Sequence, residues 1–282
     1  MKSSNPVFTR SAEFNGKGGV ATATSPSQWQ IDLNDSPTSP THTERGAGRM
    51  TFDTVVEKTA VTLGVLVAAA AVTWIFVGDL TPDNPTASDA YGKAFTYAIV
   101  GALIGLVLSL VNSFKKVVSP ALVLAYAVFE GVFVGAFSKV IAAYVNDPSI
   151  VFQAVVGTMV AFGGTLAAYK FFDIKVTDKF RRVVTISIFA FVGATLINLI
   201  LSWMGVVDNG GIRGFNTLGL VVSAAAVVLA VFMLILDFDY VEKGVAAGLS
   251  ERESWRAAFG LTVTLVWLYI EILRILAILR GN

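Results

Sequence analysis

The amino-acid sequence predicts an all-α integral membrane protein with seven transmembrane helices. Hydrophobic residues make up 55% of the 282-residue chain and charged residues only 15%, whereas a soluble domain carries about 25% charged residues. The apolar residues also gather in runs of about 20, the length that crosses a hydrocarbon core ~30 Å thick at ~1.5 Å per helical residue. The lipid bilayer is therefore the predicted environment of most of the chain.

The first 50 residues differ from the rest in composition, because they are rich in Ser, Thr, Asn, Gly and Pro. Such a segment cannot bury enough apolar surface to offset the entropy lost on ordering. We therefore expect residues 1–50 to form a disordered tail and residues 51–282 to form the transmembrane domain. The tail is interpreted either as an inert solvated segment or as a docking or phosphorylation segment.

Seven apolar segments follow, separated by polar or turn-forming stretches. The weakest break lies between the third and fourth segments, where Asn146, Asp147 and Pro148 predict a tight turn. The predicted spans are approximately residues 59–77, 94–111, 121–144, 151–171, 183–203, 218–236 and 257–279.

Small and polar residues predict contacts between these helices. Gly101 and Gly105 have GxxxG spacing, as do Gly131 and Gly135, and this spacing lets two helix backbones approach closely. Packing within the chain is favoured over a dimer face. Asn198, within the fifth segment, is expected to form an interhelical hydrogen bond.

The distribution of Lys and Arg predicts the orientation in the membrane. The N-terminal flank and the connections after the second, fourth and sixth segments are basic, whereas the alternate connections carry only Lys93 and Arg213. Cytoplasmic loops carry the excess of Lys and Arg. We therefore expect a multi-pass protein of the plasma membrane, with its N-terminus in the cytoplasm and its C-terminus outside.

Composition excludes several classes of function. The chain has no cysteine, and its single histidine, His42, lies in the tail, so a thiolate metal site or an intramembrane Ser-His-Asp triad is excluded. A net charge of +1 argues against a nucleic-acid partner. No P-loop, HExxH or GxSxG motif is present. An enzyme is thus the least expected class, and no cofactor is predicted.

The informative residues are ionisable groups in or beside apolar segments, because each costs about 2.5–3.5 kcal/mol at the bilayer centre on insertion scales. Glu130 lies midway along the third segment, Asp237 and Asp239 close the sixth, and Glu271 and Arg274 lie in the seventh.

These residues have both structural and functional interpretations. Glu271 and Arg274 are three residues apart and can pair on one helix face. Glu130 can stay protonated and hydrogen-bonded, while Asp237 and Asp239 can simply mark a helix exit. Alternatively, several carboxylates facing one cavity would attract cations, and two close carboxyls tend to share a proton. Their oxygens also suit hard cations such as Ca²⁺.

Two motifs near the C-terminus carry a family resemblance. Asp237, Asp239 and Val241 fit one frame at the end of the sixth segment, and the seventh segment reads LYIEILRILAILRG. Both motifs resemble the Bax inhibitor-1 family (transmembrane Bax-inhibitor-motif proteins), in its bacterial branch. Glu271 stands where the family usually has Asp, and Arg274 stands where it often has Asn.

The resemblance implies six helices around a central seventh and a pH-sensitive Ca²⁺ leak. Asp237 and Glu271 would be the gate and pH sensor, and tentatively a calcium site. Beyond the resemblance, our hypothesis is that Asp239 and Glu130 line the pathway and that Arg274 competes for the Glu271 carboxylate. Calcium is then a permeant ion rather than a cofactor, and protons are the second expected ligand.

Other functions stay open. Family members are also similar to regulators of membrane-protein quality control and stress survival, so the alternative is a non-conducting regulator that binds a membrane protease or another membrane protein. A proton-coupled transporter would need a substrate cavity near the midplane, and no internal inverted repeat supports one.

Helix register tests the implied acid pair. A sixth helix from Leu218 places Asp237 ~29 Å along its axis, and a seventh helix from Ala257 places Glu271 ~21 Å inward. Direct contact therefore requires an earlier start of the seventh helix, or a kink or offset in the sixth. The stretch ERESWRAAFG is predicted to form an exposed first turn, with Ser250 as a candidate N-cap.

Overall fold

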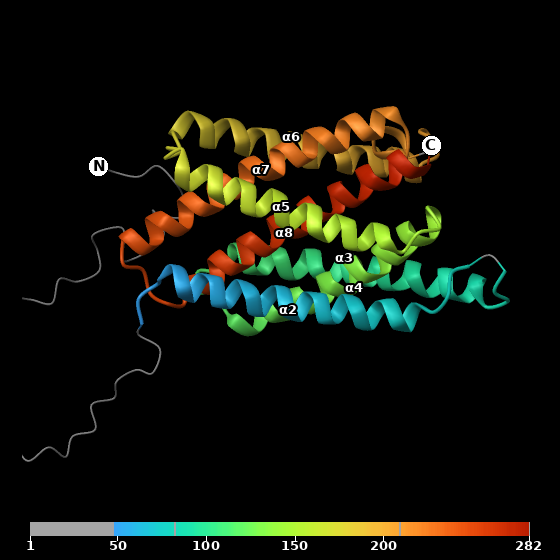
Figure 1. The fold of residues 1–282 in the computed structure, drawn as a ribbon, viewed down its shortest axis with the longest axis horizontal. Coiled ribbons are helices and arrows are strands. Elements are labelled where there is room, and N and C mark those ends of the chain that lie inside the picture. Colours follow the sequence, from blue (N-terminus) through green and yellow to red (C-terminus); the bar gives the residue numbers. More distant parts are fainter. Residues whose placement is uncertain (1–47, 82, 209, 282) are drawn as a thin grey trace, which may run out of the picture. The chain divides into compact units, whose positions relative to one another are not determined.

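The computed structural model describes residues 48–81, 83–208 and 210–281, so most of the predicted tail, including His42, lies outside the described residues. The described residues form seven α-helices, each long and apolar enough to cross a membrane. The seven-helix prediction is confirmed. The helices are α2 (Phe52–Val77), α3 (Ala87–Phe114), α4 (Pro120–Tyr144), α5 (Ser149–Phe171), α6 (Asp178–Trp203), α7 (Thr217–Ala246) and α8 (Glu253–Gly281), with a 3-10 turn, η2 (Gly211–Arg213), before α7 (Figure 1).

Every predicted apolar segment lies inside one of these helices, but the helices are longer than the segments. The largest extension is in α7, which continues to Ala246, so Asp237 and Asp239 do not mark a helix exit. Its 30 residues span ~45 Å, more than the ~30 Å hydrocarbon core. The last turns of α7 therefore extend beyond the apolar part of a bilayer.

Local sequence explains where the helices begin. The Thr51 side chain accepts a hydrogen bond from the Thr54 N–H and caps α2, and the Asn216 side chain caps α7. These side chains satisfy N–H groups that have no partner within the helix. The predicted tight turn between α4 and α5 is confirmed, with Asn146 in the left-handed region at φ 52°.

The helix α8 is the most buried helix of the bundle. Within its apolar window 67% of the residues are buried, against 6% to 44% in the other helices. It contacts α2, α4, α5 and α7, whereas α3 packs on α4 and α2, and α6 packs on α7 and η2. Figure 1 shows α8 running obliquely from the α2–α4 side of the bundle to the α6–α7 side. The expected central seventh helix is present, with four direct neighbours in the described residues.

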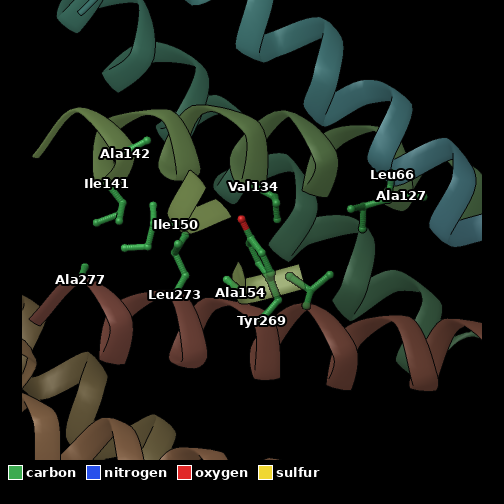
Figure 2. Close-up of a cluster of buried hydrophobic side chains, with 11 residues drawn as sticks. Leu66, Ala127, Val134, Ile141, Ala142, Ile150, Ala154, Tyr269, Leu273 and Ala277 are labelled. Atoms are coloured by element: carbon green, nitrogen blue, oxygen red, sulfur yellow. The ribbon is translucent and has the colours of Figure 1, made fainter. Parts of the chain in front are cut away.

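Glycines and small side chains allow this close packing. A methyl group at Gly131 would overlap the backbone of α2 at Leu66, and one at Gly101 would lie 2.7 Å from the Phe133 nitrogen of α4. Both GxxxG pairs therefore serve packing within the chain, as predicted. Figure 2 shows the adjoining apolar core, in which Tyr269 of α8 points toward Val134 of α4.

The two ends of the bundle differ in charge. The basic end, defined here as residues 48–51 and the connections 115–119, 172–177 and 247–252, carries most of the Lys and Arg residues that flank the helices. The opposite end comprises residues 78–81, 83–86, 145–148, 204–208 and 210–216 of the connections, and the end of α8.

The residues just before α2 pack onto the basic end. Arg49 forms an isolated β-bridge with Ser250, and the Met50 N–H donates to the Leu249 carbonyl at 2.7 Å. Met50 is only 1% exposed. Residues 48–50, which composition placed in the tail, therefore pack with the helices.

The early start predicted for the seventh helix is confirmed, because α8 begins at Glu253. Its first turn is not exposed as predicted, since Ser254 is fully buried. Ser250 is not the N-cap, because it lies three residues before the start of the helix.

Candidate functional site

Antiparallel helices α7 and α8 place a row of polar side chains along their shared interface. Nearer the basic end, the Thr264 hydroxyl of α8 donates to the Asp237 carboxylate of α7 at 2.7 Å. Nearer the opposite end, Arg274 of α8 lies 3.5 Å from the Ser223 hydroxyl of α7. Glu271 lies between these two levels on α8, two helical turns from Thr264 and on nearly the same face.

Glu271 is 1% exposed, and an arginine binds its carboxylate. The two terminal nitrogens of Arg213 donate to its two oxygens, at 2.7 and 3.0 Å. This two-pronged geometry is among the strongest charge-assisted hydrogen-bond arrangements in proteins. Arg274 lies farther away, with its Nε 4.0 Å from a Glu271 oxygen.

Arg274 completes the cluster from α8 itself. The Arg274 residue is 7% exposed. Its guanidinium donates to the Arg213 backbone carbonyl and lies 5.0 Å from the centre of the Phe215 ring. Two guanidinium groups thus meet one carboxylate, and the cluster carries one surplus positive charge. The predicted pairing of Glu271 with Arg274 is present only at the 4.0 Å limit, because Arg213 occupies both carboxylate oxygens.

Arg213 reaches Glu271 because the connection between α6 and α7 folds back toward the helices. The Asn198 side chain, buried in α6, donates to the Gly210 carbonyl and accepts from the Ile212 N–H, both at 3.0 Å. Gly210 and Gly211 adopt left-handed φ angles of 77° and 56°. Asn198 therefore binds this connection and not another helix, which corrects the expected interhelical hydrogen bond.

The structure does not bring Asp237 and Glu271 together. Thr264, the partner of Asp237, lies seven residues before Glu271, which is ~10.5 Å along the helix axis. The fully buried Leu234 and Leu268 belong to one apolar cluster at the intervening level. No hydrogen bond joins the two carboxyls in the part of the chain that the structure describes.

The tentative calcium site at these two acids stays a prediction. Across residues 48–81, 83–208 and 210–281, no group of three or more His, Cys, Asp and Glu side chains is placed to hold a metal ion. Because α8 begins at Glu253, Thr264 lies opposite Asp237. Glu271 lies farther along α8, toward the opposite end of the bundle. The gating role of Asp237 and Glu271 stays a prediction.

Asp239 lies on another face of α7. Two residues along a helix turn the side chain through ~200°, so Asp239 points away from the α7–α8 interface that holds Asp237. Its carboxylate accepts from Arg181 of α6 at 2.6 Å and from Lys243 of α7 at 2.8 Å. The Arg181 pair joins α6 to α7 near the basic end, whereas the Lys243 pair lies within α7.

Glu130 lies in a separate layer of the bundle. Glu130 belongs to α4, and a Cβ at Gly105 of α3 would be 2.8 Å from one of its carboxylate oxygens. Glu130 therefore faces α3, and the absence of a Cβ at Gly105 makes room for this acid. The predicted pathway residues Asp239 and Glu130 are not gathered with the other acids.

An exposed ion pair links α8 to the turn before α5 at the opposite end of the bundle. Arg280, at the end of α8, donates to Asp147 in the turn before α5 and to Gln153. Hydrogen bonds from the Ser149 side chain and backbone, with the nearby Arg280 charge, lower the pKa of Asp147 below its ordinary value. Such surface pairs contribute little to stability.

Sequence reasoning missed Arg213, Thr264 and Ser223. Arg213 was counted only as a loop charge, although a lone arginine in the glycine-rich stretch DNGGIRG was an available signal. Thr264 lies seven residues before Glu271 on an apolar helix, so helical periodicity places both on one face. Nothing local indicates the position of Ser223 opposite Arg274.

The described residues form seven bilayer-length helices, and the most buried of them carries an ion-pair cluster. This architecture defines a multi-pass helical membrane protein. Residues 5–281 match the sequence model of the family described as Bax inhibitor 1 like. Because the match covers nearly the whole chain, the protein belongs to this family. No curated protein gives a match to the chain.

Proposed function

We propose that the protein is a pH-sensitive cation leak of the plasma membrane, with Ca²⁺ as the permeant ion and the α7–α8 interface as its closed gate. The observation that carries the proposal is the presence of Asp237 and Glu271 in the interface of the most buried helix. An ionised side chain inside a membrane is costly, so its presence favours a role in an ion pathway.

The arrangement along α7 and α8 supports a gate with three levels. Asp237 and Thr264 offer oxygen atoms nearer the basic end, and Glu271 offers a carboxylate nearer the opposite end. Between them, Leu234 and Leu268 form an apolar layer. Hydrophobic constrictions of this kind close pores by excluding water. Separation of α7 from α8 at this layer would join the two acidic levels.

Protonation gives the proposed gate its pH sensitivity. A protonated Asp237 no longer attracts a cation, and a protonated Glu271 no longer neutralises Arg213 and Arg274. The charged groups within ionic contact of Glu271 are these two arginines, among the described residues. Flux is therefore expected to change with pH.

The test is Ca²⁺ flux into liposomes that contain the purified chain and a calcium-sensitive dye, measured over a range of pH. We expect flux above that of protein-free liposomes and an altered pH profile for Asp237→Asn. Asp147→Asn, a change of an exposed acid in the α4–α5 turn, is the matched control and should keep the wild-type profile. Absence of flux at every pH, or a wild-type profile for Asp237→Asn, contradicts the proposal.

The proposed orientation places the basic end in the cytoplasm. The chain contains no cysteine, so Lys175→Cys at the basic end and Asp208→Cys at the opposite end each introduce a single thiol. An impermeant thiol reagent added to intact cells should label the cysteine at position 208 and spare the one at 175. The reverse pattern would invert the orientation.

One observation favours the second candidate, a non-conducting regulator that binds a quality-control protease or another membrane protein. Only 6% of the apolar window of α6 is buried in the chain. Together with α7 it forms an open apolar groove of about 500 Å³, which is lined by Phe180, Phe191 and Phe232 among others. Such a face suits another transmembrane helix.

This candidate predicts crosslinking without flux. A photoreactive residue at Val183, in the groove, should crosslink to one other membrane protein. The same residue at Phe152, which is exposed on α5, should not. Equal crosslinking from both positions would argue against a defined partner face.

A further inference from the structure

We propose that Arg213 is a tethered cation that occupies the cation-binding position at Glu271, so that residues 210–214 must move outward before an ion can reach that carboxylate. The inference rests on the proposed cation leak and specifies the residue that excludes ions from its opposite-end level. Arg213 acts on the ion only through Glu271, so it is a positioning residue.

The geometry at Glu271 makes the two occupants mutually exclusive. Arg213 holds both carboxylate oxygens, at 2.7 and 3.0 Å. A calcium ion would need those oxygens at ~2.3–2.6 Å, in the space that the guanidinium fills. Arg274 is close enough to add a second positive charge, with its Nε 4.0 Å from the carboxylate. A cation therefore meets net positive charge until Arg213 leaves.

Arg213 can leave without the movement of a transmembrane helix, whereas Arg274 cannot, because Arg274 belongs to α8. Arg213 lies in η2, on the connection between α6 and α7. Gly210 and Gly211 precede it in left-handed conformations and Gly214 follows it. Glycine tolerates a wide range of backbone angles, so this stretch can change conformation at low cost.

A small set of contacts holds the connection in place. Asn198 binds the backbone at Gly210 and Ile212, and Arg274 donates to the Arg213 carbonyl. The Arg213 guanidinium also lies 5.7 Å from the centre of the Phe191 ring of α6. The Arg213 side chain is 17% exposed, so it forms the boundary between the buried cluster and the surroundings of the protein.

The test uses thiol accessibility, which does not depend on conduction. Ser223 is fully buried beside Arg274, and Ser223→Cys introduces the sole cysteine of the chain. We expect slow modification of this cysteine by a water-soluble thiol reagent in detergent micelles. Adding Arg213→Gln should raise the rate by about tenfold, which corresponds to ~1.4 kcal/mol in the opening equilibrium.

Two matched variants accompany this measurement. Arg280→Gln removes the same charge from another arginine of the opposite end and should leave the rate unchanged. Arg213→Gln combined with Glu271→Gln removes both charges of the pair, which avoids a buried carboxylate without its partner if the single variant fails to fold. This double variant should also show the faster modification.

The liposome flux of the same variants separates the two levels of the proposal. Faster modification together with increased Ca²⁺ flux supports both the tethered cation and the leak. Faster modification without any flux supports the role of Arg213 in closing the site and overturns the leak. Unchanged modification in both Arg213 variants overturns the inference, even where the wild-type chain conducts.

Discussion

Replacement of Glu271 by Gln tests the ion-pair cluster through its effect on the free energy of unfolding. The change keeps the shape of the side chain but leaves Arg213 and Arg274 facing each other without a counter-charge. Removal of one partner from a buried ion pair costs ~3–5 kcal/mol. The Arg213 side chain is 17% exposed and can turn outward, so we expect a loss of about 3 kcal/mol, the lower end of that range.

The assay is reversible unfolding of the full chain in mixed detergent micelles, as a double-mutant cycle of Glu271→Gln with Arg213→Gln. Because the double variant removes both charges, it should be more stable than the sum of the single losses implies. The exposed Asp147–Arg280 pair provides the control cycle and should be additive. Additivity within ~0.5 kcal/mol for Glu271 and Arg213 would falsify the energetic coupling that the geometry requires.

Three further predictions concern packing, the opposite end and the α6–α7 connection. Gly131→Ala should lower the free energy of unfolding by ~1–3 kcal/mol, the usual cost of overpacking. Gly163→Ala, which has open space around it, should not lower it. Equal free energies of unfolding for the two variants would contradict the α2–α4 packing. Ser149→Ala should raise the pKa of Asp147 toward its ordinary value in a carboxyl NMR titration, because the Ser149 side chain contributes most to lowering it. An Asp147 titration that is unchanged in Ser149→Ala would refute the role of the Ser149 side chain. Since the pKa of Asp147 is lowered by folding, any stabilisation from Asp147 is present above its unfolded pKa and is lost as the pH falls through the folded pKa. Asn198→Ala should lower the free energy of unfolding by ~1–3 kcal/mol, because a backbone N–H and a carbonyl lose their partner. Amide hydrogen exchange should also be faster across residues 210–214 than in the unchanged chain. Amides that stay protected there would contradict the anchoring role of Asn198.

The seven helices could be predicted because hydrophobic length is a local property of the chain. A run of about 20 apolar residues satisfies its backbone only as a helix in a bilayer. The helix ends were less predictable, since α7 continues through polar residues to Ala246. Residues outside the hydrocarbon region can stay helical without being apolar. The packing of Gly101 and Gly131 against neighbouring backbones also followed from their spacing.

Helix register limited what the sequence could indicate about the acids. Asp237 and Asp239 are two residues apart, yet they face α8 and α6 respectively, because a helix turns ~200° between them. Which face meets which helix depends on the packing of the whole bundle. The same packing puts Thr264, and not Glu271, opposite Asp237.

By itself, the sequence determined the membrane environment, the number of spans and the presence of charges that need partners, because each of these follows from composition over a short stretch. Only the tertiary structure decided the partners. Arg274, the nearest candidate along the chain, stands 4.0 Å from Glu271, while Arg213 takes both carboxylate oxygens from 58 residues away. The physical reason is that ion pairs form between groups that are close in space, and here the Asn198-anchored connection brings the arginine to the buried acid.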